Sequence, residues 1–430
     1  MSGRRYFRAV ALTLAATAAS GQEDAADTPP PPEPPFAYRA TLHAEINGTL
    51  RVSYESPPLP LSLTADYEFV DVQSAVIEGA AVRRYESAVS TVTVGDDTPA
   101  TTALRPNRGP QRVFLEIGGV GVAATGGPLT HDEAGLLELP LDPLAVMRLM
   151  GSALLTDDVS DELTATAFLG VDTVRDVTAD ITAPRLPDEP VGRVAGTAEA
   201  ADDGATVSIE FTVAWRTLPD GETVRVDLTR VDKREVGPVS PGMDVTTTAA
   251  LTYVPIDPPA DLAGLDPTPP EAPRYLFVPL PANAAILVTP EWRLFHGSPS
   301  VVVLRLLRSG RPVAQANLTA AARLSPGEHT PDAVFRADVA NAVGAAADAI
   351  GEAVSGTRED GVRFARVVAS GPGPAAADDD GPRAMEWRYV LLTAPDGRQL
   401  SALFTLDARD ADAFAAEESG FINAVRFGDL

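Results

Sequence analysis

The feature that most constrains the fold of this chain is a repeated alternation of apolar and polar side chains. Apolar residues occupy the odd positions of residues 61–69, with polar residues between them. The same alternation runs through residues 207–215 and 224–228. A period of two gives a strand one buried face and one solvent-facing face, which is typical of an antiparallel sheet. We therefore expect residues 37–255 to form a mainly antiparallel, curved β-sheet domain.

The dipeptide Asn47-Gly48 looks like a two-residue hairpin turn. The apolar residues on both sides of it stand at even positions, at 42, 44 and 46 before it and at 50, 52 and 54 after it. A hairpin would set these two groups on opposite sides of the sheet, whereas one continuous strand puts them all on one face. We predict a single long strand, kinked at Gly48, with its turn at residues 55–60.

Short helices are expected in the middle of this domain. Thr130 and Glu133 have the spacing of a capping box, in which each side chain binds the other residue's amide. Asp142-Pro143 is a favourable start for a helix over residues 144–150, and residues 160–169 form a third candidate. We expect these helices to cover the apolar face of the sheet.

The second half of the chain mixes the two kinds of element. Thr330-Pro331 opens a predicted helix whose apolar stripe runs through positions 335, 339, 343, 346, 350 and 354. A closing helix is predicted over residues 407–427. Strands are predicted at residues 275–280, 285–288, 301–307, 312–318, 362–369, 386–393 and 399–406. This order predicts an α+β sandwich over residues 274–430, so the fold class of the whole chain is expected to be α+β.

The layout at the start of the chain is that of an export signal. Arginines at positions 4, 5 and 8 precede an apolar run over residues 9–19, and Ala19-Ser20-Gly21 suits a signal peptidase. The run is too short to cross a bilayer, which needs roughly 20 residues. We predict a signal peptide over residues 1–21 and a periplasmic or secreted protein. Arg4-Arg5 also fits the twin-arginine export pattern, so the export route stays open.

Proline-rich stretches divide the rest of the chain of 430 residues. Residues 22–36, rich in Asp and Pro, are predicted to be an extended linker, and residues 256–273 a second linker between two domains. After the signal, the sequence has no uninterrupted apolar segment of 18 residues, so no integral membrane span is expected.

Composition excludes several functions. The formal net charge of −26 repels nucleic acid phosphates, so no nucleic acid partner is expected. The chain has no cysteine, which excludes disulfides, thiolate metal sites and cysteine nucleophiles.

No motif in the sequence assembles a reactive site. The four histidines, His43, His131, His296 and His329, lie far apart and are interpreted as surface or loop residues. Residues 119–124 imitate a dinucleotide-binding turn, but Gly and Pro at 126–128 interrupt the helix that such a turn requires. The acidic clusters at 202–203 and 378–380 are interpreted as solvated turns. We predict no catalytic residue, no metal site and no cofactor.

A resemblance adds to this reading. Several segments of the second half carry it: TPEWR at residues 289–293, the helix after Thr330, the strands EWRYVLLT and GRQLSALFTL, and the closing FINAVRF. With these segments in this order, the second half resembles the PsbP-like superfamily, which includes a Ran-binding nuclear import factor. The resemblance implies an α+β sandwich that binds or organises other proteins. The first domain resembles the curved sheets of bacterial lipoprotein carriers, and the whole chain is similar to exported proteins of planctomycete-type bacteria.

Taken together, the sequence predicts an exported, soluble, non-catalytic binding or interaction protein of the cell envelope. Its partner would be another protein or a small apolar ligand. Two alternatives stay open: a carrier that holds a lipid or lipoprotein on a curved β-sheet, and a hydrolase with dispersed carboxylates.

Overall fold

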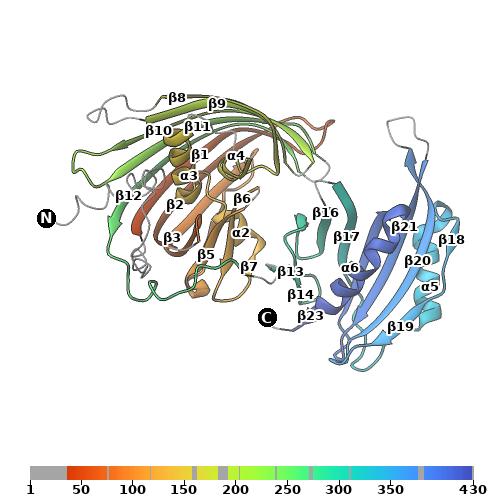
Figure 1. Ribbon diagram of the computed structural model, residues 1–430. Helices are drawn as coiled ribbons and strands as arrows, with labels where there is room; N and C mark the ends of the chain where they lie inside the picture. Colours follow the sequence, from red (N-terminus) through yellow and green to blue (C-terminus); the bar gives the residue numbers. More distant parts are fainter. Residues whose placement is uncertain are drawn as a thin grey trace, which may run out of the picture.

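The computed structural model describes residues 36–74, 77–116, 118–156, 162–182, 192–202, 204–237, 240–270, 275–308, 311–375 and 382–428. Within these ranges the chain forms two units with separate apolar cores (Figure 1). We call residues 37–256 the N-terminal unit and residues 276–427 the C-terminal unit. The predicted signal peptide and first linker lie outside the described residues.

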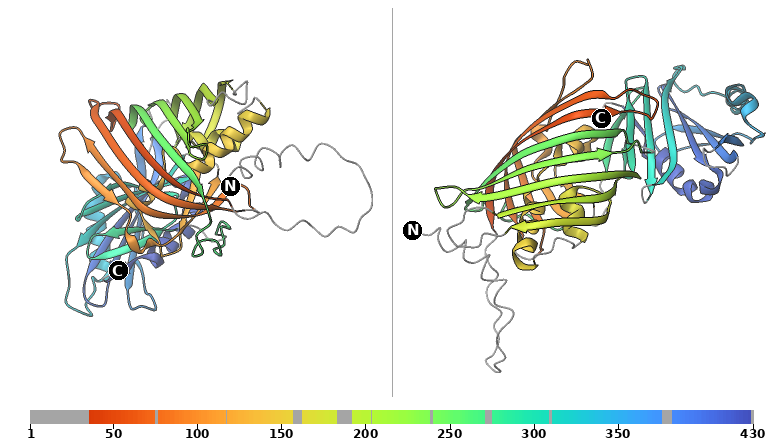
Figure 2. Two further views of the ribbon diagram at one scale, coloured as in Figure 1. Left: turned by 90° about the vertical axis from the view of Figure 1, so that its left-hand side faces the viewer. Right: turned by 90° about the horizontal axis from the view of Figure 1, so that it is seen from above.

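The N-terminal unit is built on an antiparallel sheet of eleven strands. In sheet order these are β6 (Gly119–Ala124), β5 (Gln111–Glu116), β3 (Ala80–Val94), β2 (Leu59–Gln73), β1 (Ala37–Arg51), β12 (Gly242–Ile256), β11 (Val224–Arg234), β10 (Ala205–Thr217), β9 (Gly192–Asp202) and β8 (Thr173–Thr182), with β4 (Ala100–Ala103) paired to β3. The sheet curls around three helices, α2 (His131–Leu137), α3 (Pro143–Thr156) and α4 (Glu162–Leu169) (Figures 1 and 2).

The long first strand is confirmed. β1 continues through Gly48, which lies opposite Leu61 on one side and Val245 on the other. A side-chain carbon at Gly48 would come within 2.1 Å of the Asp244 carbonyl oxygen, so the close approach of β12 requires glycine there. A turn near Asp220 separates β10 from β11, and there the Asp220 carboxylate accepts hydrogen bonds from the amides of Glu222 and Thr223.

The three predicted helices form, and their caps explain where they begin. The Thr130 hydroxyl accepts the Glu133 amide, and the Glu133 carboxylate accepts the Thr130 amide, which completes the capping box of α2. The Asp142 carboxylate accepts the Leu144 amide at the start of α3.

The C-terminal unit is an antiparallel sheet of eight strands with two helices. The sheet runs β15 (Trp292–Gly297), β16 (Val301–Arg308), β17 (Arg311–Ala321), β22 (Gln399–Asp407), β21 (Pro382–Thr393), β20 (Arg363–Ala375) and β18 (Ala349–Ile350), with β19 (Val354–Thr357) paired to β20. Helix α6 (Ala411–Ala424) packs Phe414 and Phe421 on one face, and α5 (Asp332–Val343) packs Phe335 and Val339 on the other.

The predicted α+β class is wrong, and with it the PsbP-like sandwich. Strand residues far outnumber helical residues, and large antiparallel sheets form both units, so the described chain is mainly β. The helix after Thr330 ends at Val343 because Gly344 turns into the left-handed region at φ +55°. The apolar positions Ile350 and Val354 then belong to β18 and β19, where β-branched side chains are favoured. The closing helix is also shorter than predicted.

A small sheet of four strands joins the two units. Its order is β23 (Arg426–Phe427), β14 (Ala284–Val288), β13 (Leu276–Leu280) and β7 (Leu129–Thr130). β7 belongs to the N-terminal unit and pairs in parallel with β13 of the C-terminal unit. The second proline-rich stretch packs on the N-terminal unit, where Leu262 is buried against Val70 and Val82.

Candidate binding site

The concave face of the N-terminal sheet forms one continuous apolar wall. Alternate residues of each strand point inward, as the period of two requires. Most of this wall is buried in the core of the unit. Its buried side chains include Tyr38, Leu42, Tyr67, Phe69, Val194, Val207, Ile209, Phe211, Val213, Val226, Leu228 and Leu251.

The three helices pack into this concave face. The α2 residues Leu136 and Leu137 are buried in the same core, as is Leu149 of α3. In α4, Phe168 lies edge-on to Phe211 with ring centroids 5.6 Å apart. Helix α4 contacts both β6 and β8, the first and last strands of the sheet, and so spans the open side of the curled sheet (Figure 2).

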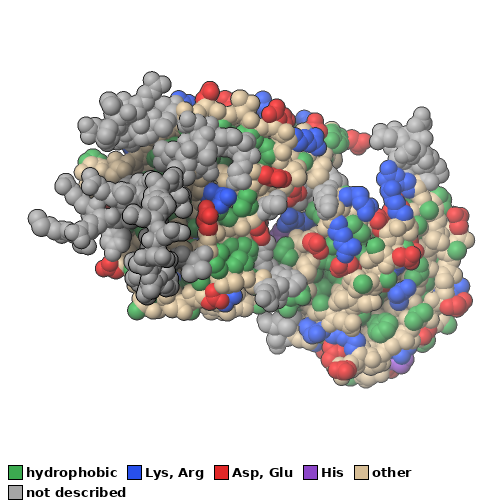
Figure 3. Space-filling model, viewed as in Figure 1, with side chains coloured by type: hydrophobic (Ala, Val, Ile, Leu, Met, Phe, Trp, Pro, Cys, Tyr) green, Lys and Arg blue, Asp and Glu red, His purple; other side chains and the backbone are tan. Residues whose placement is uncertain are grey.

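The helices do not cover the apolar wall completely. Other apolar side chains pack against the core and stay partly exposed, and we call this set the apolar ring: Leu63, Tyr85, Leu115, Val120, Val122, Met147, Met150, Val174, Val177 and Ile181. Apolar side chains reach the surface in the middle of this unit (Figure 3). An apolar ligand placed among these side chains would remove their surface from water, which is favourable by roughly 25 cal/mol per Å².

A buried ion network ties α3 to the sheet beside this ring. The Arg83 guanidinium is fully buried and donates to both oxygens of Asp71, at 2.7 Å each. It also donates to Asp142, the residue that caps α3, at 2.7 Å. The Tyr38 hydroxyl donates to Asp71 at 2.6 Å, and the guanidinium carbon of Arg83 lies 4.4 Å from the centre of the Phe69 ring.

The pKa values of this network follow from its burial. Burial raises the pKa of the Asp71 carboxyl, and Arg83 opposes that change. Burial alone would lower the pKa of Arg83, but Asp142 and Asp71 raise it well above its ordinary value. The pKa of Tyr85 is raised to about 12, first by burial. Arg83 is therefore a permanent cation that holds two carboxylates.

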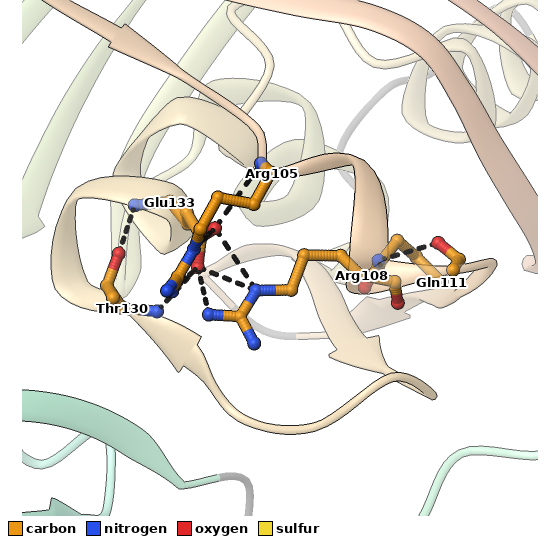
Figure 4. A network of polar contacts seen from close by, with 6 residues as sticks. Arg105, Arg108, Gln111, Thr130 and Glu133 are labelled. Atoms are coloured by element: carbon orange, nitrogen blue, oxygen red, sulfur yellow. Dashed lines mark hydrogen bonds and ion pairs between the residues drawn. The ribbon is translucent and has the colours of Figure 1, made fainter. Parts of the chain in front are cut away.

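A second network holds α2 (Figure 4). The buried Glu133 carboxylate accepts hydrogen bonds from Arg105 at 2.6 Å and from Arg108 at 2.9 Å. Both arginines come from the connection between β4 and β5, whereas Glu133 comes from α2. Arg108 is buried and Arg105 is half exposed. Because Glu133 also completes the capping box with Thr130, one carboxylate connects the start of α2 to the sheet.

Every buried carboxylate in the described ranges forms an ion pair with arginine. The pairs are Asp71 and Asp142 with Arg83, Glu133 with Arg105 and Arg108, Asp232 with Arg230, Asp410 with Arg311, and Glu418 with Arg388 and Arg366. An arginine beside each carboxylate offsets part of the cost of burying its charge.

The structure keeps the four histidines apart. His43 lies on the convex face, where hydrogen bonds to Asp66 and Glu45 raise its pKa. His131 begins α2, and burial lowers its pKa. His296 lies on β15, and His329 lies in the segment before α5. No group of three or more metal-binding side chains gathers among the described residues.

Other sequence interpretations can also be compared with the structure. Trp215 and Trp292 are core residues, while Trp387 is only partly buried. Residues 119–124 form β6 and not a dinucleotide-binding turn. The acidic cluster at 378–380 lies outside the described residues.

Sequence reasoning missed the Arg83 network. Its one local signal is Asp71, which continues the inward-facing odd positions of β2 beyond Phe69, where an apolar residue is expected. Asp71 lies directly opposite Arg83 in the pairing of β2 with β3. A charged residue at an inward position therefore indicated a partner, but the identity of that partner depends on the strand order.

Comparison with known proteins gives no family. No known family matches the chain, and no curated protein matches it. Solved structures that align include the translocator domain of the autotransporter NalP from Neisseria meningitidis, at 9% identity over 94% of this chain and 94% of that chain, with a TM-score of 0.13. An outer membrane channel from Pseudomonas putida F1 aligns at 7% identity over 90% of this chain and 99% of that chain, with a TM-score of 0.14. The outer membrane protein OprD from Pseudomonas aeruginosa aligns at 8% identity over 86% of this chain and 92% of that chain, with a TM-score of 0.14.

These neighbours contradict one prediction. We expected no integral membrane span, but these three aligned structures are outer membrane proteins or a translocator domain. The expectation rested on the hydropathy of continuous segments, and it is withdrawn. Among the described residues, no helix has both the length and the apolar character needed to cross a bilayer. TM-scores this low show no shared fold, so the function is argued below from the site.

Proposed function

We propose that this protein is an exported, non-catalytic binding protein of the cell envelope, and that its N-terminal unit carries an apolar ligand such as an acyl chain. The ligand would lie between the concave face of the sheet and helices α2, α3 and α4. The observation that carries the proposal is that the apolar side chains of the apolar ring pack on the core and stay partly exposed.

Two physical arguments support a carrier. Short helices packed on a curved sheet can move as units when the contacts that hold them loosen, and here apolar packing and the Arg83 and Glu133 networks are those contacts. The apolar ring extends over β2, β3, β5, β6, β8 and α3, so it offers a long surface and no single polar anchor. That shape suits a flexible hydrocarbon chain better than a compact polar molecule. The export signal predicted over residues 1–21 supports a place in the envelope, where such cargo occurs.

The test uses a fluorescent fatty acid, cis-parinaric acid, and two variants of neighbouring residues on β8. Val177 belongs to the partly exposed apolar ring, whereas Thr178 is exposed on the opposite face. We expect the Val177→Asp variant to bind the fatty acid at least about tenfold more weakly, since a carboxylate would be desolvated by the chain. The Thr178→Asp variant should bind as the unchanged protein does.

Native mass spectrometry of protein purified without detergent gives an independent measurement. A carrier is expected to retain an adduct with the mass of a lipid or fatty acid. A protein that shows only its own mass and does not bind cis-parinaric acid would refute the carrier function.

A further inference from the structure

The small sheet between the units places one strand of the N-terminal unit in the sheet of the C-terminal unit. Leu129 and Thr130 of β7 lie opposite Leu276 and Phe277 of β13, in parallel. Beyond this point β13 continues into the C-terminal core, where Val278 is buried. Leu276 packs against the cores of both units. The pairing is therefore a direct physical connection between the two cores.

Thr130 has two structural roles at this connection. It is the last residue of β7, and it is also the residue that caps α2. No residue separates the strand from the helix, so a displacement of β7 must move the start of α2. Helix α2 also contacts β13 directly.

The other end of α2 packs in the core under the concave face of the sheet, where we propose that the ligand lies. Leu136 and Leu137 are buried in the core under the concave sheet, and the Tyr67 hydroxyl donates to the Leu136 carbonyl oxygen at 2.9 Å. A helix of seven residues has little independent stability, so its position depends on these contacts, on the ion pairs of Glu133 with Arg105 and Arg108, and on its attachment to β13.

Charge at the same place adds a further contact between the units. Burial lowers the pKa of His131, the first residue of α2, and Arg293 of β15 lowers it further, against the effect of Asp132. The guanidinium of a C-terminal strand therefore lies within electrostatic range of the first turn of α2.

We propose that β7 and α2 form a gate of the ligand space in the N-terminal unit, and that strand β13 of the C-terminal unit holds this gate closed. The gate rests on the proposed carrier function only for the identity of the molecule that passes through it. The physical claim is that α2 cannot move away from the sheet without loosening β7 from β13, so that changes in the C-terminal unit control the opening of α2.

The absence of cysteine from the chain makes a cross-link the sharpest test. Leu129 and Leu276 lie directly opposite one another, and neighbouring strands are about 4.8 Å apart, within the range that a disulfide spans. In the Leu129→Cys, Leu276→Cys double variant, oxidation should slow hydrogen exchange of the amides at residues 135–137 about tenfold relative to the reduced form of the same protein. Release of cis-parinaric acid should slow by a similar factor.

A second pair of variants tests the same claim without a cross-link. Val278 on β13 and Val313 on β17 are both buried in the C-terminal core. The Val278→Ala variant should increase exchange at residues 135–137 several-fold more than the Val313→Ala variant does. If the two variants change exchange equally, or if oxidation leaves exchange unchanged, the gate is refuted. Slower exchange in a protein that binds no fatty acid would keep the gate and refute the carrier.

Discussion

Replacement of Arg83 by methionine is the change with the largest expected effect on folding. Methionine fills much of the same apolar volume but removes the charge that pairs with Asp71 and Asp142. Both carboxylates are almost fully buried. Removing one partner of a buried ion pair costs about 3–5 kcal/mol, which is a large part of the 5–15 kcal/mol typical of a folded domain. We therefore expect the Arg83→Met variant to lose about 3–5 kcal/mol of unfolding free energy at pH 7.

The pH dependence of that loss has a definite sign. The pKa of Asp71 is raised in the folded protein, first by burial, and Arg83 opposes the rise. Without Arg83 the folded pKa rises further. A raised carboxyl pKa costs no stability below the unfolded value of about 4, and the cost grows as the pH rises from the unfolded value to the folded value, above which it stays constant. The difference in stability between the Arg83→Met variant and the unchanged protein should therefore shrink as the pH falls toward 4.5.

The assay is urea unfolding, followed by tryptophan fluorescence, at pH 4.5 and pH 7.5. Arg84→Met is the matched control, because Arg84 is the next residue of β3 and its ion pair with Asp261 is partly exposed. The Arg84→Met control should lose at most about 1 kcal/mol of unfolding free energy. Adding Asp71→Asn and Asp142→Asn to Arg83→Met should recover part of the stability. A loss below 1 kcal/mol for Arg83→Met, or a loss that is equal at both pH values, would refute the reasoning.

Three further predictions concern the backbone and the convex face. The Gly48→Ala variant should lose about 1–3 kcal/mol in the same urea assay, because its side chain would overlap the Asp244 carbonyl. Gly135→Ala in α2, where nothing lies within 4 Å of the added carbon, should instead gain about 0.5–1 kcal/mol, and a loss there would contradict the fold of α2. In an NMR titration His43 should show a pKa above the ordinary value, and Asp66→Asn should lower it; an unchanged midpoint would contradict the contact between the two side chains.

Much of the local structure could be predicted from the sequence, because it depends on neighbouring residues. The even spacing of apolar residues around Gly48 identified β1 as one strand, and the Thr130 and Glu133 spacing identified the start of α2. Strands β13, β14, β16, β17, β20, β21 and β22 were also predicted near their observed positions, whereas β15, β18, β19 and β23 were not predicted. The prediction failed after Gly344, where one glycine in the left-handed region outweighs an apolar stripe of helical period.

The sequence by itself determined that the chain has strands with one apolar face, caps at defined residues and no thiol chemistry. Only the tertiary structure decided which charges meet and which helix touches which strand. Asp71 and Arg83 are twelve residues apart, and Asp142 lies fifty-nine residues beyond Arg83. Leu129 and Leu276 are separated by most of the N-terminal unit. Periodicity carries information only along the chain, whereas these contacts depend on strand order and on how the sheet curls, which no local pattern records.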